Sequence, residues 1–538
     1  MSDHSDNPRP VSAKRAGAVT IVGQLVKALV QLVGLIAFSH LLSPRDIGIF
    51  TMLVVVLSLG ELLRDFGLSQ ASIQTAVLTQ RQASNLFWSN VLIGVVMACT
   101  LYTAAPALAD LYGEPALRTV APWVALAFII NALQAQFQVR LTRDLRFVAL
   151  TATDASAQVM GLVAGLIAAV EGLGYWSLVI QMLVIYASVL AQRAVIADWW
   201  PGRPRRTDGM VALYRFGLHS GLAQLTNYVA FNADSYVVGT RWGASALGIY
   251  NRAFQMFTVP ASQLLAPLTN VVLPYLSKRH HDSDSFYPFL LKVQVFISVV
   301  LTGLFSIAAS LAAPIVITAL GQQWRESAPL LSILSIGGAI QVLSYVTFWA
   351  YLASDNTRPL LFSALVTRSI LVLCIIGGST MGLTGVACGV TAGLTAAWFI
   401  NLAWLKRCNH MPISSFAKSG LHVLLCGAVA GGMGWYLVTH LVHASPLGSM
   451  LVGVPAVTAI YISLIMSSRS VRTLFRDAVD PIVARLGGPY PRYSRSHCGP
   501  SSEHVQDGNQ AQPVFTDSRI QQVTDDESAT IPRHQSRQ

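Results

Sequence analysis

Polar side chains at helical spacing interrupt the first long apolar stretch, and these residues are well suited to bind a ligand. Gln24, Lys27 and Gln31 occupy positions i, i+3 and i+7, which lie on one face of a helix. Amides donate and accept hydrogen bonds, as sugar hydroxyls require, and the Lys27 ammonium group offsets the charge of a phosphate. Such a stripe either lines a hydrated cavity or joins neighbouring helices by hydrogen bonds. We favour the cavity.

A second polar stripe, Gln224, Asn227 and Asp234, follows 200 residues later, and Arg252 lies in the next apolar stretch at a similar depth. We expect Asp234 and Arg252 to form an ion pair. This pair either opens and closes during a transport cycle or statically fixes the geometry of one half of the protein.

Other ionisable side chains inside apolar stretches are site candidates, because a charge within a membrane span costs several kcal/mol unless it faces water or a partner. Asp154 is a candidate for ion coupling and Arg368 for phosphate contact, although each could instead reach toward the membrane surface or pack between helices. The predicted ion-coupling or gating residues are Asp154 and Asp234. The predicted substrate pathway comprises Gln24, Lys27, Gln31, Gln224, Asn227, Arg252 and Arg368.

Three charged residues, Glu61, Arg64 and Asp65, lie together at the end of the second apolar stretch. We expect them to pair with one another near the membrane interface.

Lipid must be the solvent for most of this chain. Of its 538 residues, 53% are hydrophobic and 11% charged, and the mean hydropathy is +0.53. A membrane span needs about 20 apolar residues. The sequence predicts about fourteen such spans, near 18–42, 46–66, 84–109, 116–138, 148–170, 175–197, 214–240, 246–276, 289–320, 328–353, 359–381, 384–406, 415–441 and 447–467.

An internal repeat indicates a duplicated helical bundle. Residues Arg15, Gly17, Gln24, Leu25, Gly48 and Ile49 recur at the same spacing as Arg215, Gly217, Gln224, Leu225, Gly248 and Ile249. Transporters built from repeated bundles bind cargo at the repeat interface and rock one half against the other. The predicted fold is therefore an all-α integral membrane protein of two pseudo-symmetric six-helix bundles plus a C-terminal helix pair.

The predicted organisation follows from the spans and from composition. It consists of a polar N-terminus (1–17), an N-lobe (18–197), a linker (198–213), a C-lobe (214–406), an extra helix pair (407–467) and a tail (468–538). The tail is rich in polar residues and is expected to be mostly disordered. The segment Val139–Phe147 places basic and apolar residues on different faces, as in a helix lying on the membrane surface.

Basic residues alternate between the loops and predict that both termini are cytoplasmic. The net charge of +11 is dispersed over many loops, so no nucleic-acid partner is expected. The six cysteines and the histidines show no disulfide framework or metal-ligand spacing, no removable signal peptide is evident, and no cofactor is expected.

Several ordered blocks resemble the polysaccharide-transporter branch of the multidrug, oligosaccharidyl-lipid and polysaccharide exporter (MOP) superfamily, the Wzx-type flippases, and most closely the exopolysaccharide and colanic-acid type. The blocks are Leu41–Phe50, Asp65–Ala71, Arg143–Phe147, Gly174–Val179, Leu247–Ala253, Val272–Ser277 and Leu320–Trp324. The resemblance implies a MATE-like fold with a central cavity, in the bacterial inner membrane. It also implies translocation of an undecaprenyl-pyrophosphate-linked oligosaccharide from the cytoplasmic to the periplasmic leaflet.

Two other functions are weighed against this interpretation. A multidrug or cation antiporter of the same superfamily would be expected to carry acidic residues in its cavity, whereas the stripes here include Lys27, Arg252 and Arg368. A membrane enzyme that polymerises or ligates sugars needs catalytic groups on a sizeable outward loop, and no predicted outward loop is long. Coupling to a proton or sodium gradient, and contact with a polysaccharide polymerase and a chain-length regulator, remain open.

Overall fold

The computed structural model describes residues 13–65, 68–75, 78–207, 210–279, 283–354, 357–409, 411–441, 445–469 and 471–478. All of them belong to one compact unit, Met1–Leu486. The structure describes the predicted tail (468–538) only as far as residue 478, without residue 470. Its first part, 471–478, is helical and packs on a neighbouring helix, with Phe475 stacked on Phe296 and Asp477 3.2 Å from the Lys292 ammonium group.

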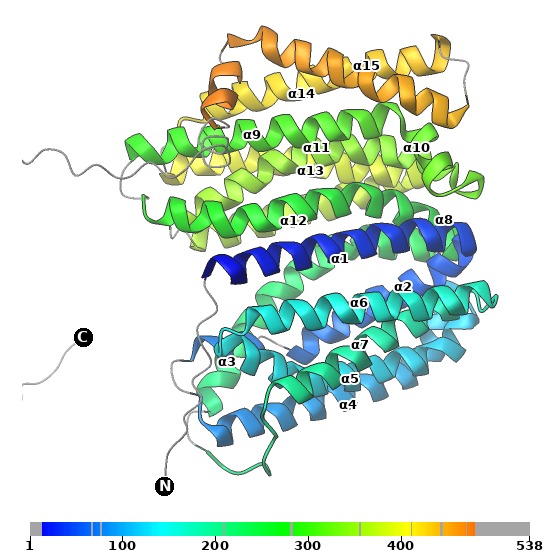
Figure 1. Cartoon of the computed structure of the whole chain (residues 1–538), viewed down its shortest axis with the longest axis vertical. Coiled ribbons are helices and arrows are strands. Elements are labelled where there is room, and N and C mark those ends of the chain that lie inside the picture. The colour runs from blue at the N-terminus through cyan, green and yellow to red at the C-terminus, as the bar shows by residue number, and fades with distance from the viewer. Residues whose placement is uncertain are drawn as a thin grey trace, which may run out of the picture. The chain divides into compact units, whose positions relative to one another are not determined.

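The described residues of the first half form six long helices and one short one (Figure 1). They are α1 (Ala13–Leu41), α2 (Pro44–Asp65), α3 (Leu68–Gln74), α4 (Gln80–Tyr112), α5 (Ala116–Arg143), α6 (Phe147–Val170) and α7 (Trp176–Ile196).

The second half begins with α8 (Met210–Ser277), which bends at Gly243. Gly243 has φ 76°, a left-handed value that favours glycine. The elements after it are α9 (Ser283–Ser310), α10 (Ala312–Ala319), η1 (Gln322–Trp324), α11 (Ser327–Ala353), α12 (Thr357–Gly378), η2 (Ser379–Met381), α13 (Gly382–Asn409), α14 (Ile413–Tyr436), η3 (Leu437–Leu441) and α15 (Pro446–Ser467).

The all-α membrane fold is confirmed. Within the described residues there is no strand, and eleven stretches are long and apolar enough to cross a membrane. One of these, Pro359–Cys408, contains both α12 and α13, and the two arms of α8 are additional to the eleven. Twelve of the fourteen expected spans therefore coincide with such stretches, and the arms of α8 are helices at the positions of the other two. The linker is shorter than predicted, because α8 already begins at Met210.

The expected span 289–320 is two helices, α9 and α10. The break falls at Leu311. Pro314 has no N–H to donate to the carbonyl of Ser310, so a continuous helix would lose a hydrogen bond there.

The expected surface helix over Val139–Phe147 is wrong. Its first residues are the last turn of α5, and Leu145, at φ 55°, turns the chain into α6. The basic side chains of this segment bind the carbonyl ends of other helices: Arg143 donates to Ser72 O at 2.7 Å, and Arg146 donates to Ile196 O at 2.8 Å. The amphipathic pattern therefore reflects helix capping.

The two copies of the sequence repeat meet each other in space. The turn between α1 and α2 corresponds to the bend of α8, and Gly48 of α2 faces Gly248 of α8. A Cβ atom on Gly48 would lie 1.7 Å from Ala244 O, and one on Gly248 would lie 1.9 Å from Pro44 O. Backbone packs directly on backbone here, so neither position has room for a side chain. We call this end of the bundle the joined end.

Gly248→Ala is expected to force the two backbones apart and to cost about 1–3 kcal/mol, as overpacking of a close contact does. Thermal unfolding of the purified protein measures the effect. Gly377→Ala is the matched control, because nothing lies within 4 Å of a Cβ atom at Gly377. Equal unfolding midpoints for the two variants would contradict the close packing of the repeats.

Candidate functional site

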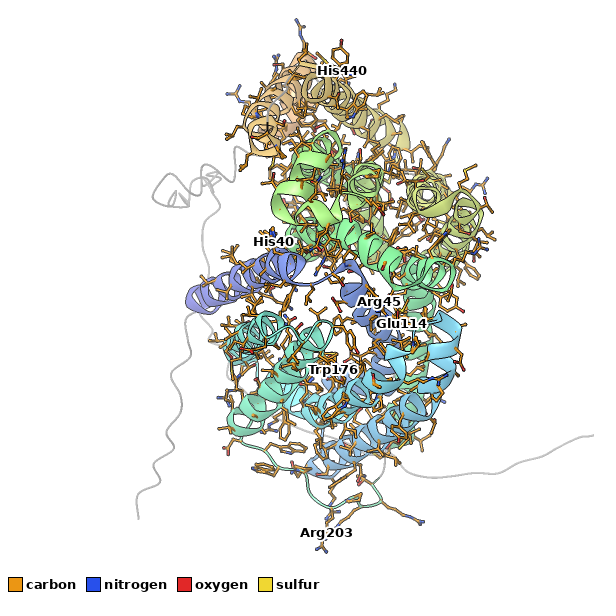
Figure 2. The ribbon with its side chains drawn as sticks, turned by 90° about the vertical axis from the view of Figure 1, so that its right-hand side faces the viewer. His40, Arg45, Glu114, Trp176, Arg203 and His440 are labelled. Atoms are coloured by element: carbon orange, nitrogen blue, oxygen red, sulfur yellow. The ribbon has the colours of Figure 1, made fainter. Side chains whose placement is uncertain are left out.

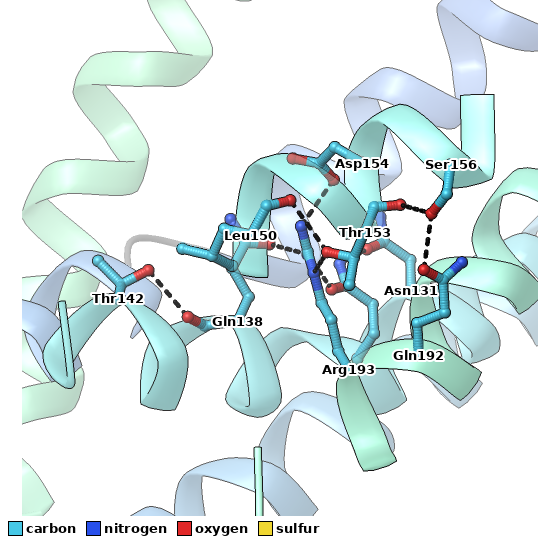
Figure 3. Close-up of polar contacts among 10 residues, drawn as sticks. Asn131, Gln138, Thr142, Leu150, Thr153, Asp154, Ser156, Gln192 and Arg193 are labelled. Atoms are coloured by element: carbon cyan, nitrogen blue, oxygen red, sulfur yellow. Dashed lines mark hydrogen bonds and ion pairs between the residues drawn. The ribbon is translucent and has the colours of Figure 1, made fainter. Parts of the chain in front are cut away.

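A buried guanidinium in the N-lobe organises a polar network between α5, α6 and α7 (Figure 3). The Arg193 side chain is 4% exposed, and its Nη2 donates to Asp154 Oδ1 at 2.7 Å. Its Nη1 donates to Gln134 Oε1 at 2.8 Å and to Gln138 Oε1 at 3.0 Å. The predicted coupling residue Asp154 is therefore paired, although its side chain is 46% exposed.

The network continues to a second carboxylate on α2. Gln134 Nε2 donates to Asn131 Oδ1 at 2.7 Å, and Asn131 Nδ2 donates to Glu61 Oε1 at 2.5 Å. The Tyr186 hydroxyl also donates to Glu61 Oε1, at 2.8 Å. Glu61 and Asp154 are thus the ends of one hydrogen-bonded chain that crosses the N-lobe.

The expected pairing of Glu61 with Arg64 and Asp65 stays a prediction, because the side chains of Arg64 and Asp65 lie outside the described residues. The sequence analysis missed Arg193. This residue lies one turn from the end of its span, where a basic side chain ordinarily reaches the membrane surface.

The C-lobe contains a cavity of about 570 Å³ between α8, α11, α12 and α13. Arg368 lies on its wall and is the one charged residue among the described residues that line it. The Arg368 guanidinium carbon lies 4.1 Å from the centre of the Phe231 ring, and its buried Nε has no hydrogen-bond partner. The polar lining consists of Gln341, Ser344, Tyr345, Thr347, Tyr351, Ser363, Thr367 and Asn401.

This cavity combines the two features needed to hold an anionic sugar-bearing group. A guanidinium has several donors in a planar fork, which matches phosphate oxygens. Hydroxyl and amide groups around it suit sugar hydroxyls. The geometry is compatible with the phosphate contact predicted for Arg368.

The stripe on α1 lies between the lobes. Gln31 Oε1 accepts a hydrogen bond from Gln263 Nε2 of α8 at 2.9 Å. With Gln255, Gln31 also lines a second, mainly apolar cavity of about 230 Å³. Lys27 is half-buried and Gln24 is exposed. The stripe thus provides one hydrogen bond that joins helices of different lobes, and Lys27 stays a predicted cavity residue.

The equivalent stripe on α8 is only partly described, because the side chains of Gln224 and Asn227 lie outside the described residues. The predicted ion pair between Asp234 and Arg252 does not form. Buried Asp234 accepts a hydrogen bond from the Tyr250 hydroxyl at 2.7 Å, and Arg252 donates to Gln255 Oε1 at 2.9 Å.

Helix geometry explains this correction. Residues two apart on a helix point in nearly opposite directions, so Arg252 cannot share the face from which Tyr250 reaches Asp234. Its guanidinium instead lies 5.7 Å from the ring centre of Trp324, and Arg252 is only 5% exposed. Arg252 is not among the residues that line the C-lobe cavity.

At the joined end, C-lobe side chains bind the last turn of α1. Such a turn leaves carbonyl groups without partners in its own helix. Ser39 O accepts hydrogen bonds from Gln323 Nε2 at 2.6 Å and from Trp324 Nε1 at 2.8 Å. His40 Nε2 lies 3.1 Å from Ala319 O. Figure 2 looks onto this end of the bundle, with His40 and the ion-paired Arg45 and Glu114 labelled.

Comparison with known families decides the assignment. The family model for "Polysaccharide biosynthesis protein" matches residues 37–329, more than half of the chain. The chain belongs to this polysaccharide biosynthesis family.

Curated relatives of this family member include transport and biosynthesis proteins of bacterial polysaccharides. The teichuronic acid biosynthesis protein TuaB of Bacillus subtilis is 27% identical over 285 residues, which cover 53% of this chain and 59% of TuaB, less than two thirds of that protein. The lipopolysaccharide biosynthesis protein WzxC of Escherichia coli is 24% identical over 404 residues, 73% of this chain and 79% of WzxC.

Solved structures agree on the fold of this family member. The inward closed conformation of the lipid II flippase MurJ superposes with a TM-score of 0.69, 14% sequence identity, and coverage of 86% of this chain and 99% of that one. The inward-facing conformation of a MATE family multidrug resistance transporter superposes with a TM-score of 0.53 and 17% identity, covering 74% and 99%. These similarities place the chain in the MOP fold.

Replacing Arg193 by Met is expected to destabilise the N-lobe by about 3 kcal/mol, because it leaves buried polar partners unmatched. Arg118→Met, at an exposed ion pair with Asp110 of similar length, is expected to cost less than about 1 kcal/mol. Chemical or thermal unfolding of the two purified variants measures the difference. A smaller loss for Arg193→Met than for Arg118→Met would contradict the organising role of Arg193.

Proposed function

We propose that this protein is a flippase that moves an undecaprenyl-pyrophosphate-linked oligosaccharide from the cytoplasmic to the periplasmic leaflet of the bacterial inner membrane. The observation that carries the proposal is the C-lobe cavity, in which Arg368 is surrounded by hydroxyl and amide groups inside a two-lobe transporter fold. The names of the relatives TuaB and WzxC support a role in polysaccharide export, and the name of MurJ supports a lipid-linked cargo.

Different parts of the protein bind the pyrophosphate and the sugars of the cargo. Arg368 holds the pyrophosphate, and the polar cavity wall holds the first sugars. Lys27, half-buried on α1 of the opposite lobe, adds a second positive charge on the pathway. Amide groups along this pathway come from Gln24, Gln31, Gln224 and Asn227. Arg252 lies outside the C-lobe cavity and acts through Gln255, to which it donates a hydrogen bond.

The lobes alternate access by separating at the joined end. At that end α2 packs along α8, and apolar side chains of both helices, such as Ile49 and Leu247, are buried in one core that the two lobes share. The glycine contact and the hydrogen bonds from Gln323 and Trp324 to α1 add to this packing.

We further propose that the N-lobe network couples this movement to a proton or sodium gradient. Glu61 and half-exposed Asp154 are linked through Arg193, so a change in the charge of one end alters the partners of the other. Asp234, held by Tyr250, is the gating candidate of the C-lobe. A polysaccharide polymerase and a chain-length regulator are the proposed protein partners, and we propose that both termini are cytoplasmic.

A multidrug antiporter is the alternative function, favoured by the shared fold with the MATE transporter. The cationic cavity argues against it, because Arg368 repels a cationic drug and no carboxylate is among the described lining residues.

Arg368→Gln is expected to lower translocation of a lipid-linked oligosaccharide at least about tenfold, since a charge-assisted hydrogen bond contributes about 1.5–3 kcal/mol. The measurement uses purified protein in proteoliposomes with a pyrophosphate-linked oligosaccharide as cargo. Arg368→Lys is expected to restore part of the rate, and exposed Arg407→Gln serves as the matched control. Undiminished translocation by Arg368→Gln would contradict the phosphate contact, and absence of translocation by the unmodified protein would contradict the function.

A further inference from the structure

The segment 198–207 between α7 and α8 is held along the first turns of α4; we call it the strap. Asn85 binds both backbone groups of Arg205: its Oδ1 accepts from Arg205 N at 3.0 Å and its Nδ2 donates to Arg205 O at 2.6 Å. Gly202 N donates to Ser84 Oγ at 2.9 Å, and Trp88 Nε1 donates to Gly202 O at 2.9 Å. The backbone of the strap is therefore fixed over its length.

Aromatic packing anchors the beginning of the strap. Trp199 is 7% exposed, packs edge-on against Phe87 and Phe137, and donates from Nε1 to Gln80 Oε1 at 2.5 Å. Gln80 Nε2 donates in turn to Trp200 O at 3.1 Å. Because Trp199 points inward, its neighbour Trp200 points outward and is 71% exposed.

The fixed backbone presents a cationic surface. Arg203, Arg205 and Arg206 are exposed, and Figure 2 shows Arg203 at the outer edge of the strap, pointing away from the helices. The ion pairs found among the described residues involve none of these three arginines. The acidic side chain that the described part of the strap itself contributes is exposed Asp198 at its start.

We propose that the strap is a binding site for the headgroups of anionic phospholipids. Its position at an end of the helix bundle puts it level with a membrane surface, where an exposed tryptophan inserts among headgroups. Guanidinium groups bind phosphate in a bidentate manner, and neighbouring arginines attract anionic lipid together.

A signal for membrane orientation requires only positive charge in a loop. The strap has more than this, because six hydrogen bonds between it and α4 fix the positions from which its arginines project. The α4 partners are Gln80, Ser84, Asn85 and Trp88. This fixed geometry is what distinguishes a lipid site from a topological signal.

The test measures retention of phosphatidylglycerol by the purified full chain, using native mass spectrometry, with phosphatidylcholine as the uncharged control lipid. Replacing Arg203, Arg205 and Arg206 together by Gln is expected to weaken phosphatidylglycerol retention at least about tenfold, because three attractive charges are removed. The matched control replaces three other exposed basic residues, Lys406, Arg407 and Arg469, by Gln and is expected to retain the lipid.

Asn85→Ala is a second variant that keeps every arginine but releases the strap backbone, and it is expected to lower retention as well. Equal retention by the strap and control triple variants would overturn the proposal, as would full retention by Asn85→Ala. Displacement of the lipid by inorganic phosphate at equal concentration would show a site for free anions instead. Binding of an acidic peptide in preference to the lipid would identify a protein partner and would also overturn the proposal.

Discussion

The direct contact between the backbones of α2 and α8 is the constraint on which the arrangement of the two lobes depends. Gly48 and Gly248 are corresponding positions of the sequence repeat, and each lies where a single added carbon would strike a carbonyl oxygen of the other lobe. This contact brings α1 within reach of Gln323 and Trp324, which complete the hydrogen bonding of its last turn. The lobes are joined by this close backbone approach, by apolar side chains of α2 and α8 that are buried together, and by a few hydrogen bonds.

The two lobes differ in chemistry although they share a fold. In the N-lobe the positive charge of Arg193 is matched by Asp154 and by amides, and Glu61 is reached through the same amides. In the C-lobe the guanidinium of Arg368 has an aromatic neighbour and a free donor. A balanced network resists change until a charge is added or removed, whereas an unbalanced cation attracts an anion. On this difference we base the proposal that the first lobe couples transport and the second binds the cargo.

The sequence allowed prediction of those features that depend on local periodicity. Apolar stretches gave the helices, and the repeated Gly-Ile pair marked the two positions that meet. Arg368 could be singled out because it is a charge within an apolar stretch. Features that depend on side-chain direction could not be predicted: Asp234 binds Tyr250 because Arg252 projects from another face of the same helix. Arg193 and the capping arginines of 139–147 were missed or misread because their partners come from distant helices.

The most direct test of the account is the distance between the lobes at the joined end. Spin labels at exposed Arg118 of α5 and exposed Arg325 after η1, placed in protein without its native cysteines, report that distance by pulsed electron resonance in nanodiscs. The account predicts one short distance without cargo and an additional longer distance when a lipid-linked oligosaccharide is supplied. A single unchanged distance in a preparation that translocates the oligosaccharide would contradict it.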